Sequence, residues 1–251
     1  MSGHSKWANI KHRKAAQDAK RGNLFQKLVR AIIIAAKDGG GDPAMNMRLK
    51  TAIERAKAVS VPNDNITRAI KRGTGELGDI SYDELTYEVI GPAGIAILVN
   101  VMTDNRNRTT PEIRALLARN GGQMGSEGSV AWMFDRKGVI EVKGENLDED
   151  ELMTLGLDSG MSDMEASDEG FTLYCEPGDL DALQKALEDN KYVVDNAEVS
   201  MIAKTPVEVA DPEAARKVLK LVDALEEHDD VQNVYSNFDI PDEVASQIED
   251  E

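Results

Sequence analysis

A cluster of cationic side chains near the start of the chain has the type and spacing needed to bind a polyanion. Between Lys6 and Arg21 there are six Lys or Arg residues and one acidic residue, Asp18. If this stretch is helical, five of the cations fall within about 120° of one another around the helix axis. Such a face neutralises phosphates and releases their counterions, which gives affinity for nucleic acid without reading the bases. The five cations of this face are Lys6, Arg13, Lys14, Lys20 and Arg21.

Two other interpretations of this helix have less support. A surface helix held by pairs of opposite charge one turn apart needs acidic partners, and only Asp18 is present. A helix lying on a membrane needs large apolar residues opposite its cations, whereas that side carries alanines. Trp7 and Ile10 point toward the basic side, so either the helix begins later, near Asn9, or these two residues do not fill a core. Trp7 suits stacking on a base as well as packing against a neighbouring helix.

A second candidate site lies in the segment TDNRNRT at residues 103–109. Arg106 and Arg108 precede a predicted helix start at 109–112, which has a capping threonine, an early proline and an acidic residue. Free N–H groups and the helix dipole favour anions at such a place. The alternative is a turn in which Asn and Asp side chains bond to the backbone. The sequence leaves both open.

The charge is divided unevenly along the chain. Residues 1–77 hold 16 Lys or Arg and 6 Asp or Glu, a net charge of +10. Residues 78–251 hold 13 Lys or Arg and 40 Asp or Glu, a net charge of -27. A division of this kind indicates that one part meets a polyanion while the rest does not.

Other function classes find little support. The single cysteine, Cys175, excludes a disulfide within the chain, and the three histidines lack the spacing of a zinc site. No nucleophile elbow, phosphate-binding glycine loop or EF-hand spacing is present. The carboxylates occur mostly in runs typical of solvated caps and loops. We therefore predict no enzyme activity, no metal and no cofactor, and a buried, inert Cys175 thiol.

The sequence also lacks the signals of a membrane or exported protein. Its longest apolar patch, 31–36, is far shorter than the roughly 18 residues of a membrane span. No apolar segment or cleavage site follows the basic start, as it would in a secretory signal. We expect a cytoplasmic protein with no membrane partner. The sequence does not indicate an oligomeric state.

Hydrophobic periodicity predicts a helical first part and a mixed remainder. Apolar residues recur at helical spacing in segments separated by glycine or proline. From residue 82 the period changes to two, which indicates strands. The predicted helices are 24–36, 45–56, 66–73, 109–120 and 212–227, and the predicted strands are 82–90, 95–103, 129–134 and 231–238.

Residues 137–203 follow the order β-α-β-β-α-β, which is the ferredoxin-like signature. The strands before this segment lack a closing helix and strand, which residues 204–240 supply. We therefore predict an α+β multidomain fold: an N-terminal helical bundle followed by two α+β domains, the ferredoxin-like one inserted in the other. The predicted domains are 1–77, 78–136 with 204–240, 137–203, and an acidic tail at 241–251.

Several segments resemble one protein family closely. GHSKWANIKHRKAAQDAKRG is similar to the opening of YebC-type proteins, the probable transcriptional regulators that include the mitochondrial translational activator of cytochrome oxidase. The likeness continues in GGGDP, NDNITRAIKRG, YEVIGPAGIAI, TDNRNRT, NGGQMGSEGSVAWMFDRKGVI and AEVSMI, from Gly3 to about Phe238. One departure is Ala93, where the family pattern leads us to expect glycine.

The resemblance implies the same domain order and a non-enzymatic role in gene expression. It implies either DNA-binding regulation of transcription or, as the alternative, a ribosome-associated factor that binds ribosomal RNA and assists the synthesis of proline-rich stretches. Ribosomal proteins are a further partner in the second case. The contact residues implied by the resemblance are Lys6, Lys11, Arg13, Lys14, Lys20 and Arg21, with Arg106 and Arg108 as a second contact.

The residues themselves do not decide between DNA and ribosomal RNA. The first helix has only Asn9 and Gln17 as amide side chains that could read bases, and phosphate contacts carry no sequence information. Structured RNA is recognised through shape and backbone, which a basic helix can do. The acidic remainder would then face away from RNA or meet basic proteins, which mildly favours a composite partner such as the ribosome.

Overall fold

The computed structural model describes residues 18–78, 82–144, 147–167 and 170–249. These residues are divided between two units. The helix–sheet unit contains the described residues up to 127 together with 216–234. The ferredoxin-like unit contains residues 128–215 and 235–249.

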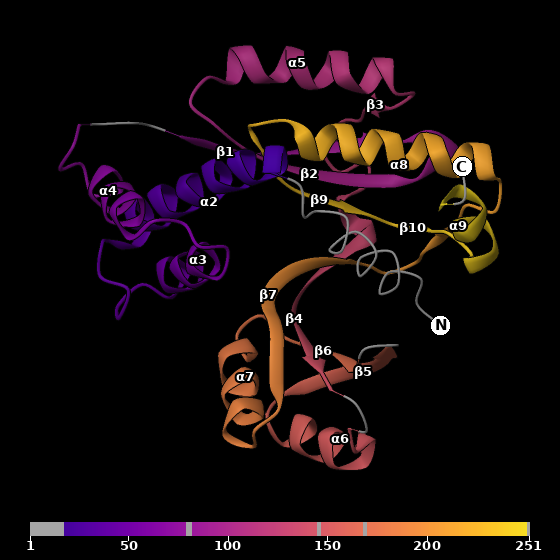
Figure 1. Ribbon diagram of the computed structural model, residues 1–251. Coiled ribbons are helices and arrows are strands. Elements are labelled where there is room, and N and C mark those ends of the chain that lie inside the picture. Colours follow the sequence, from indigo (N-terminus) through magenta and orange to yellow (C-terminus); the bar gives the residue numbers. More distant parts are fainter. Residues whose placement is uncertain (1–17, 79–81, 145–146, 168–169, 250–251) are drawn as a thin grey trace. The chain divides into compact units, whose positions relative to one another are not determined.

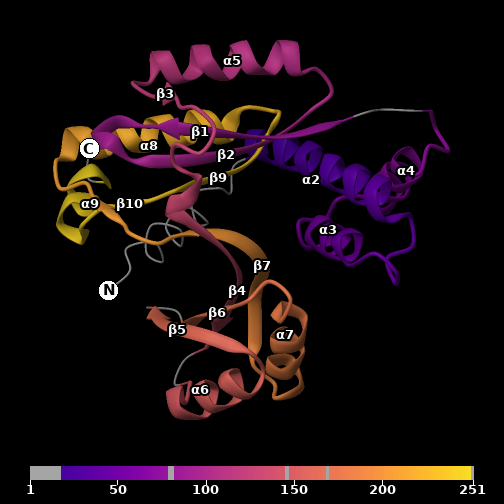
Figure 2. The ribbon, with the colours of Figure 1, turned by 180° about the vertical axis from the view of Figure 1, so that it is seen from behind.

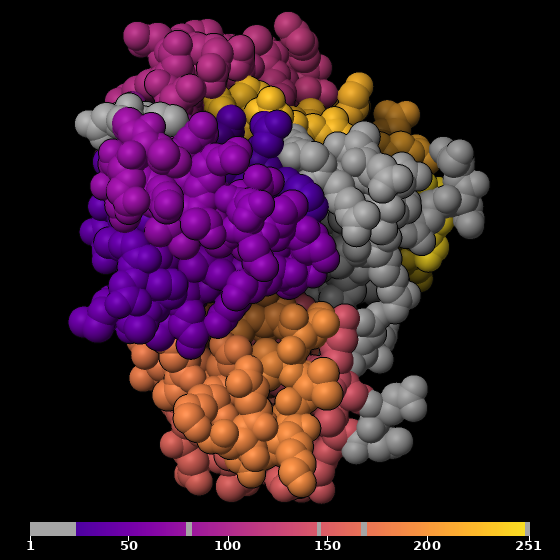
Figure 3. Space-filling view, turned by 60° about the vertical axis from the view of Figure 1, so that its left-hand side comes forward, coloured from indigo at the N-terminus to yellow at the C-terminus, as the bar shows by residue number. Residues whose placement is uncertain are grey.

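Three helices at the start of the helix–sheet unit share one apolar core (Figure 1). Helical spacing brings Ile32 and Ile33 of the first, Leu49 and Ile53 of the second, and Ile66 of the third into this core. Figure 3 shows the three helices, in indigo to purple, as one continuous surface. They are α2 (Asp18–Gly39), α3 (Met47–Ala58) and α4 (Asn63–Gly73).

The structure confirms the three helices predicted after the basic stretch and corrects two of their ends. The described part of the basic stretch, from Asp18, is continuous with α2 through Gly22 and is not a separate helix. Met45, which we expected in the core, is 84% exposed. The reason is that α3 begins only at Met47, where the side chain of Asn46 accepts a hydrogen bond from the Leu49 N–H and caps the helix.

A four-stranded sheet forms the rest of the helix–sheet unit, with strand order β3-β1-β2-β9. The helices α5 and α8 lie on the same side of this sheet in both ribbon views (Figures 1 and 2). The two central strands confirm the predicted hairpin, with Ile90 opposite Ala96. The elements are β1 (Asp83–Ile90), β2 (Ala96–Thr103), α5 (Arg106–Arg119), β3 (Gln123–Met124), α8 (Pro212–Glu227) and β9 (Val231–Ser236).

The hairpin turn holds position 93 in a backbone conformation that favours glycine. The turn is a short 3₁₀ helix, η1 (Pro92–Gly94), in which Ala93 has φ 58°. This left-handed conformation brings the Cβ atom close to the following carbonyl and costs a non-glycine residue about 1 kcal/mol. Ala93 therefore carries strain that glycine would avoid.

The strand β9 lies after the ferredoxin-like segment in the sequence but pairs with β2, which lies before it. The ferredoxin-like segment is thus an insertion, as predicted. Its sheet has the order β5-β6-β4-β7, with all three neighbouring pairs antiparallel and the helices α6 and α7 in the two crossovers. The elements are β4 (Phe134–Lys143), α6 (Glu149–Asp158), β5 (Met161–Ser167), β6 (Gly170–Cys175), α7 (Leu180–Asp189) and β7 (Val193–Ala203).

The side chain of Cys175 is buried in the core of this unit, as predicted. Burial, together with the nearby charges of Asp179 and Glu176, raises the pKa of its thiol to about 11. At neutral pH the group is therefore a thiol and not a nucleophilic thiolate.

Three predictions about elements are wrong at their details. The expected strand at 129–134 is instead a 3₁₀ helix, η2 (Ala131–Met133), and the strand β4 begins at Phe134. The helix expected from 109–112 begins at Arg106. The last strand, expected at 231–238, ends earlier, at Ser236. The further elements are α9 (Asp242–Glu249) and a pair of short parallel strands, β8 (Val207–Glu208) and β10 (Phe238–Asp239).

These elements agree with the predicted fold class. The domain boundaries given above stay a prediction.

Candidate nucleic-acid interface

The described residues include only part of the predicted contact set. Lys6, Lys11, Arg13 and Lys14 lie outside them. The backbone of Lys20 and Arg21 lies in the first turns of α2. Arg106 and Arg108 are described fully, and the structure separates their roles.

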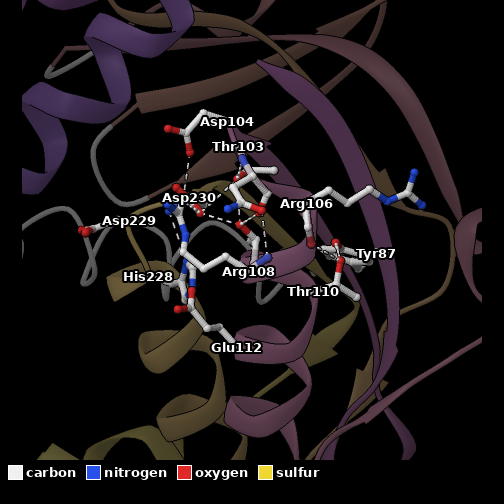
Figure 4. Close-up of polar contacts among 12 residues, drawn as sticks. Tyr87, Thr103, Asp104, Arg106, Arg108, Thr110, Glu112, His228, Asp229 and Asp230 are labelled. Atoms are coloured by element: carbon white, nitrogen blue, oxygen red, sulfur yellow. Dashed lines mark hydrogen bonds and ion pairs between the residues drawn. The ribbon is translucent and has the colours of Figure 1, made fainter. Parts of the chain in front are cut away.

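Arg108 is held by carboxylates of the chain itself. Its guanidinium lies 2.8 Å from Oδ2 of Asp230 and 3.1 Å from Oδ1 of Asp104 (Figure 4). The hydrogen bond to Asp230 and the charge of Asp230 raise the pKa of Arg108. A phosphate would have to compete with both carboxylates for this guanidinium. The geometry therefore favours a structural role for Arg108 over the predicted contact.

Asp230 is the centre of this cluster, with a side chain only 3% exposed. Besides Arg108 it accepts a hydrogen bond from the Thr109 hydroxyl at 2.6 Å and lies 2.9 Å from the guanidinium of Arg30. Burial alone would raise its pKa, but the hydrogen bonds from Thr109 and Arg108 and the charge of Arg30 outweigh burial and lower it. Asp230 is therefore held as a carboxylate.

The same cluster fastens α2 to the sheet. Arg30 donates to the backbone carbonyl of Asp229 as well as to the Asp230 side chain. Lys27 donates to the carbonyl of Glu226, near the C-terminus of α8, where carbonyls lack helix partners and the dipole favours cations. Several cations of the basic residues 1–77 are thus used inside the molecule and are not free for a ligand.

Arg106 differs from Arg108 although the two are only two residues apart. It is the first residue of α5, because the Asn105 side chain caps that helix by accepting from the Arg108 N–H. Pro111 therefore lies inside the helix rather than at its start. The Arg106 side chain is exposed, points away from the Asp230 cluster in Figure 4, and makes no ion pair with another described residue. Of the second predicted contact, Arg106 is the residue available to an anion.

A cationic face on α4 was missed by the analysis of the sequence. Arg68, Lys71 and Arg72 lie three and four residues apart, so they project from one side of the helix. All three are exposed, and none has an ion pair within the described part of the chain. The buried residues Ile66 and Ala69 lie on the opposite side. We call Arg68, Lys71 and Arg72 the α4 face.

Close packing fixes the position of the α4 face. Gly73, the last residue of α4, lies so near α2 that a Cβ atom there would be 2.4 Å from the carbonyl oxygen of Ile33. It would also be 2.7 Å from Cβ of Ala36. Glycine is thus required for α4 to approach α2, and this contact places the neighbouring Lys71 and Arg72.

Not every cation on the bundle is available in this way. Arg48 of α3 lies 2.7 Å from Asp38 and 2.6 Å from Glu84. By contrast, the only acid of α4 is Asp64, in its first turn. The sequence signal for the α4 face was therefore present: three cations on one helical face with a single acid nearby.

Comparison with known proteins now places the chain. Residues 5–76 match the model of the TACO1/YebC protein N-terminal domain, and residues 82–238 match that of the TACO1/YebC second and third domain. The chain belongs to the TACO1/YebC family. The resemblance seen in the sequence is thus confirmed.

Full-length members of the TACO1/YebC family are similar to this chain throughout. A protein of Chlorobaculum parvum named "probable transcriptional regulatory protein" is 56% identical over 252 residues, covering 100% of both chains. One of Halothermothrix orenii with the same name is 51% identical over 253 residues, again covering both fully. A crystal structure of a conserved hypothetical protein from Aquifex aeolicus has a TM-score of 0.81 and 43% identity, covering 90% of this chain and 93% of the other.

Two findings concern other kinds of site. Among the described residues, no group of three or more His, Cys, Asp or Glu side chains is placed to hold a metal ion. In the same part of the chain, no helix has the length and apolar character needed to cross a membrane.

Proposed function

We propose that this TACO1/YebC protein is a non-enzymatic, cytoplasmic regulator of gene expression that binds nucleic acid through its basic residues 1–77. The observation that carries the proposal is the α4 face. It consists of three exposed cations, none in an ion pair with a described residue, on a helix with one acid, within residues 1–77, whose net charge is +10. The names of its relatives as transcriptional regulators support the same class of function.

The proposed contact acts on the phosphate backbone. Lys and Arg side chains that project from one helical face bind successive phosphates and release counterions. Such contacts position the protein and do not read base sequence. Arg106 and the basic residues from Lys6 to Arg21 extend the contact in this proposal.

The test compares two double variants of equal charge. Lys71→Gln with Arg72→Gln removes two cations of the α4 face, and we expect affinity for nucleic acid to fall about tenfold for each lost charge-assisted bond. The control is Lys217→Gln with Lys220→Gln, which removes two exposed cations of α8. We expect the control to bind almost as the parent protein does. The measurement is a binding titration at several salt concentrations with a labelled oligonucleotide.

The salt dependence separates a local contact from a general charge effect. Each lost phosphate contact should reduce the slope of log affinity against log salt by about 0.7 to 0.9. Equal losses in both double variants would mean that total charge, and not the α4 face, sets the affinity. Unchanged binding of the α4 variant would contradict the proposal.

A second candidate is a ribosome-associated factor that binds ribosomal RNA and assists synthesis of proline-rich stretches. The observation that favours it is the charge of the inserted segment. Residues 137–203 hold 4 Lys, no Arg and 18 Asp or Glu, a net charge of -14. Such a segment repels phosphates but attracts basic proteins. A ribosome presents both RNA phosphates and basic proteins, whereas an isolated DNA duplex presents only phosphates.

Cross-linking in cells followed by sequencing of the bound nucleic acid distinguishes the two candidates. Recovery of a focused ribosomal RNA site would exclude promoter binding as the direct role. Recovery of dispersed promoter DNA would exclude the ribosome.

A further inference from the structure

The helix α5 is cationic although it lies in the acidic part of the chain. It contains four arginines and one acid, Glu112, a net charge of +3, whereas residues 78–251 together carry -27. Arg108 is bound to Asp230 as described. The other three arginines are exposed, and no ion pair joins them to a described residue. These three are Arg106, Arg114 and Arg119.

A hollow of about 370 Å³ lies beside the C-terminal half of this helix. Arg114, Leu117 and Ala118 line it from α5, since they fall on one helical face. Gln123 and Met124 line it from the short strand β3, together with two glycines of the flanking segment. The lining residues 122–125 belong to the segment NGGQMGSEGS, which the phosphate contacts proposed above leave without a role.

The walls of the hollow are held in place by backbone hydrogen bonds. The N–H of Gly122 donates to the carbonyl of Leu117 at the end of α5, and that of Gly125 donates to Glu88 of β1. Between these two bonds, Gln123 and Met124 pair with β1. The site is thus preformed, and a ligand would not have to order it.

The chemistry of the walls suits a flat heterocycle attached to a phosphate. Ala118 and Met124 offer apolar surface, with the buried Leu117 beneath it, and the exposed Gln123 amide offers both a donor and an acceptor. The Arg114 guanidinium, which has no ion pair with a described residue, adds a cation that can stack on a ring or bind a phosphate. The volume is at the lower end of the range for ligand pockets, which matches one small ring system better than a larger ligand.

We infer that the hollow between α5 and β3 binds an unpaired nucleobase of a single-stranded nucleic acid, with Arg114 on the adjoining phosphate. A base inside a duplex is stacked and paired, so it cannot enter; a base in a loop or a single strand can. This inference rests on the proposed nucleic-acid function and adds to it a preference for unpaired bases.

The first test uses single substitutions on α5 in the full-length protein. Arg114→Gln removes the cation of the hollow, and Arg119→Gln removes an equally exposed arginine of the same helix that does not line it. With a single-stranded oligonucleotide we expect Arg114→Gln to lower affinity about tenfold and Arg119→Gln to change it less than twofold. With a duplex of the same length, the two variants should bind alike. Equal losses on the single strand would overturn the inference.

The second test changes the ligand and leaves the protein intact. An oligonucleotide in which abasic units replace the bases keeps every phosphate but has nothing to fill the hollow. We expect it to bind the parent protein several-fold more weakly than the complete strand, and Arg114→Gln to lose less of its affinity for it. Equal affinity for the abasic and complete strands would overturn the inference.

The α4 variants keep this outcome separate from the proposed function. If Lys71→Gln with Arg72→Gln weakens binding while the abasic strand binds as well as the complete one, the nucleic-acid function stands and the base site is wrong. If the parent protein binds no oligonucleotide at all, both are wrong. An isolated nucleotide that binds the hollow without any preference for the single strand would also contradict the inference, because the site would then serve a free metabolite.

Discussion

Asp230 shows how a residue far away in the sequence decides what a candidate contact residue does. Arg106 and Arg108 are equivalent in the sequence, where both lie in a short polar segment before a helix. In the structure Arg108 is bound to Asp230, which lies 122 residues later in the chain, and Arg106 is not. No local pattern contains that information, because the pairing depends on the return of β9 to the sheet beside β2.

The Asp230 cluster leads to a prediction about stability. Asp230→Asn should lower the free energy of unfolding by about 3 kcal/mol, because it leaves Arg30 and Arg108 without their shared buried counter-charge. The matched control is Asp229→Asn, whose exposed side chain should matter by no more than about 0.5 kcal/mol. Urea unfolding followed by circular dichroism measures both. Similar effects of the two substitutions would show that the cluster adds little.

The lowered pKa of Asp230 gives a second prediction, about pH. A carboxyl group whose pKa is lower in the folded state adds stability above its unfolded pKa and loses it as pH falls through the folded value. The ordinary pKa is 3.8, so the loss belongs to the acidic range near and below pH 4. The parent protein should therefore lose stability more steeply than Asp230→Asn between about pH 5 and pH 2. Parallel curves for the two proteins would contradict the assignment.

At the scale of elements, Gly73 places α4 against α2. Helix propensity alone predicts that Gly73→Ala stabilises α4 by up to about 1 kcal/mol. The contact predicts the reverse, since the added Cβ would lie 2.4 Å from the Ile33 carbonyl oxygen. We expect a loss of about 2 kcal/mol or more and weaker binding of nucleic acid through the displaced α4 face. Gly178→Ala is the control, because nothing lies within 4 Å of the added atom there. Stabilisation of the Gly73 variant would show that the helices separate easily.

The elements were predicted well where periodicity alone decides them. The helix Pro212–Glu227 has the predicted bounds, because its apolar spacing and end residues agree. The start of α5 was misplaced since Pro111 suggested a first turn, whereas the side chain of Asn105 caps the helix earlier. The apolar run before Phe134 suggested a strand but forms a 3₁₀ turn, because short apolar runs do not distinguish the two.

The candidate site was predicted less completely than the elements. The first basic stretch was predicted as a contact because its cations are dense in the sequence. The α4 face was not predicted because it has fewer cations. The cations of the α4 face are available to a ligand because the helix has one acid and they form no ion pair with a described residue. Arg48 on α3, by contrast, forms two ion pairs. A helical projection of every cation against every acid would have found the face. The ion pair between Arg108 and Asp230 could not have been found by such a projection, because the two residues lie far apart in the sequence.

At the scale of the whole molecule, the acidic residues 78–251 should restrain binding of nucleic acid by the basic residues 1–77. Charges of one sign set up a field that reaches about 14 Å at 0.05 M salt and about 8 Å at 0.15 M. We predict that Asp158→Asn, Asp163→Asn and Glu176→Gln together raise affinity for non-specific nucleic acid several-fold at low salt and hardly at all at 0.15 M. These three exposed acids belong to the ferredoxin-like unit, and none lies in the first turn of a helix, so its helix starts keep their acids. Titrations at both salt concentrations measure the effect. An equal gain in affinity at both salt concentrations would point to a direct contact instead of a field. No gain at low salt would mean that the charge of the acidic unit does not influence the binding of nucleic acid.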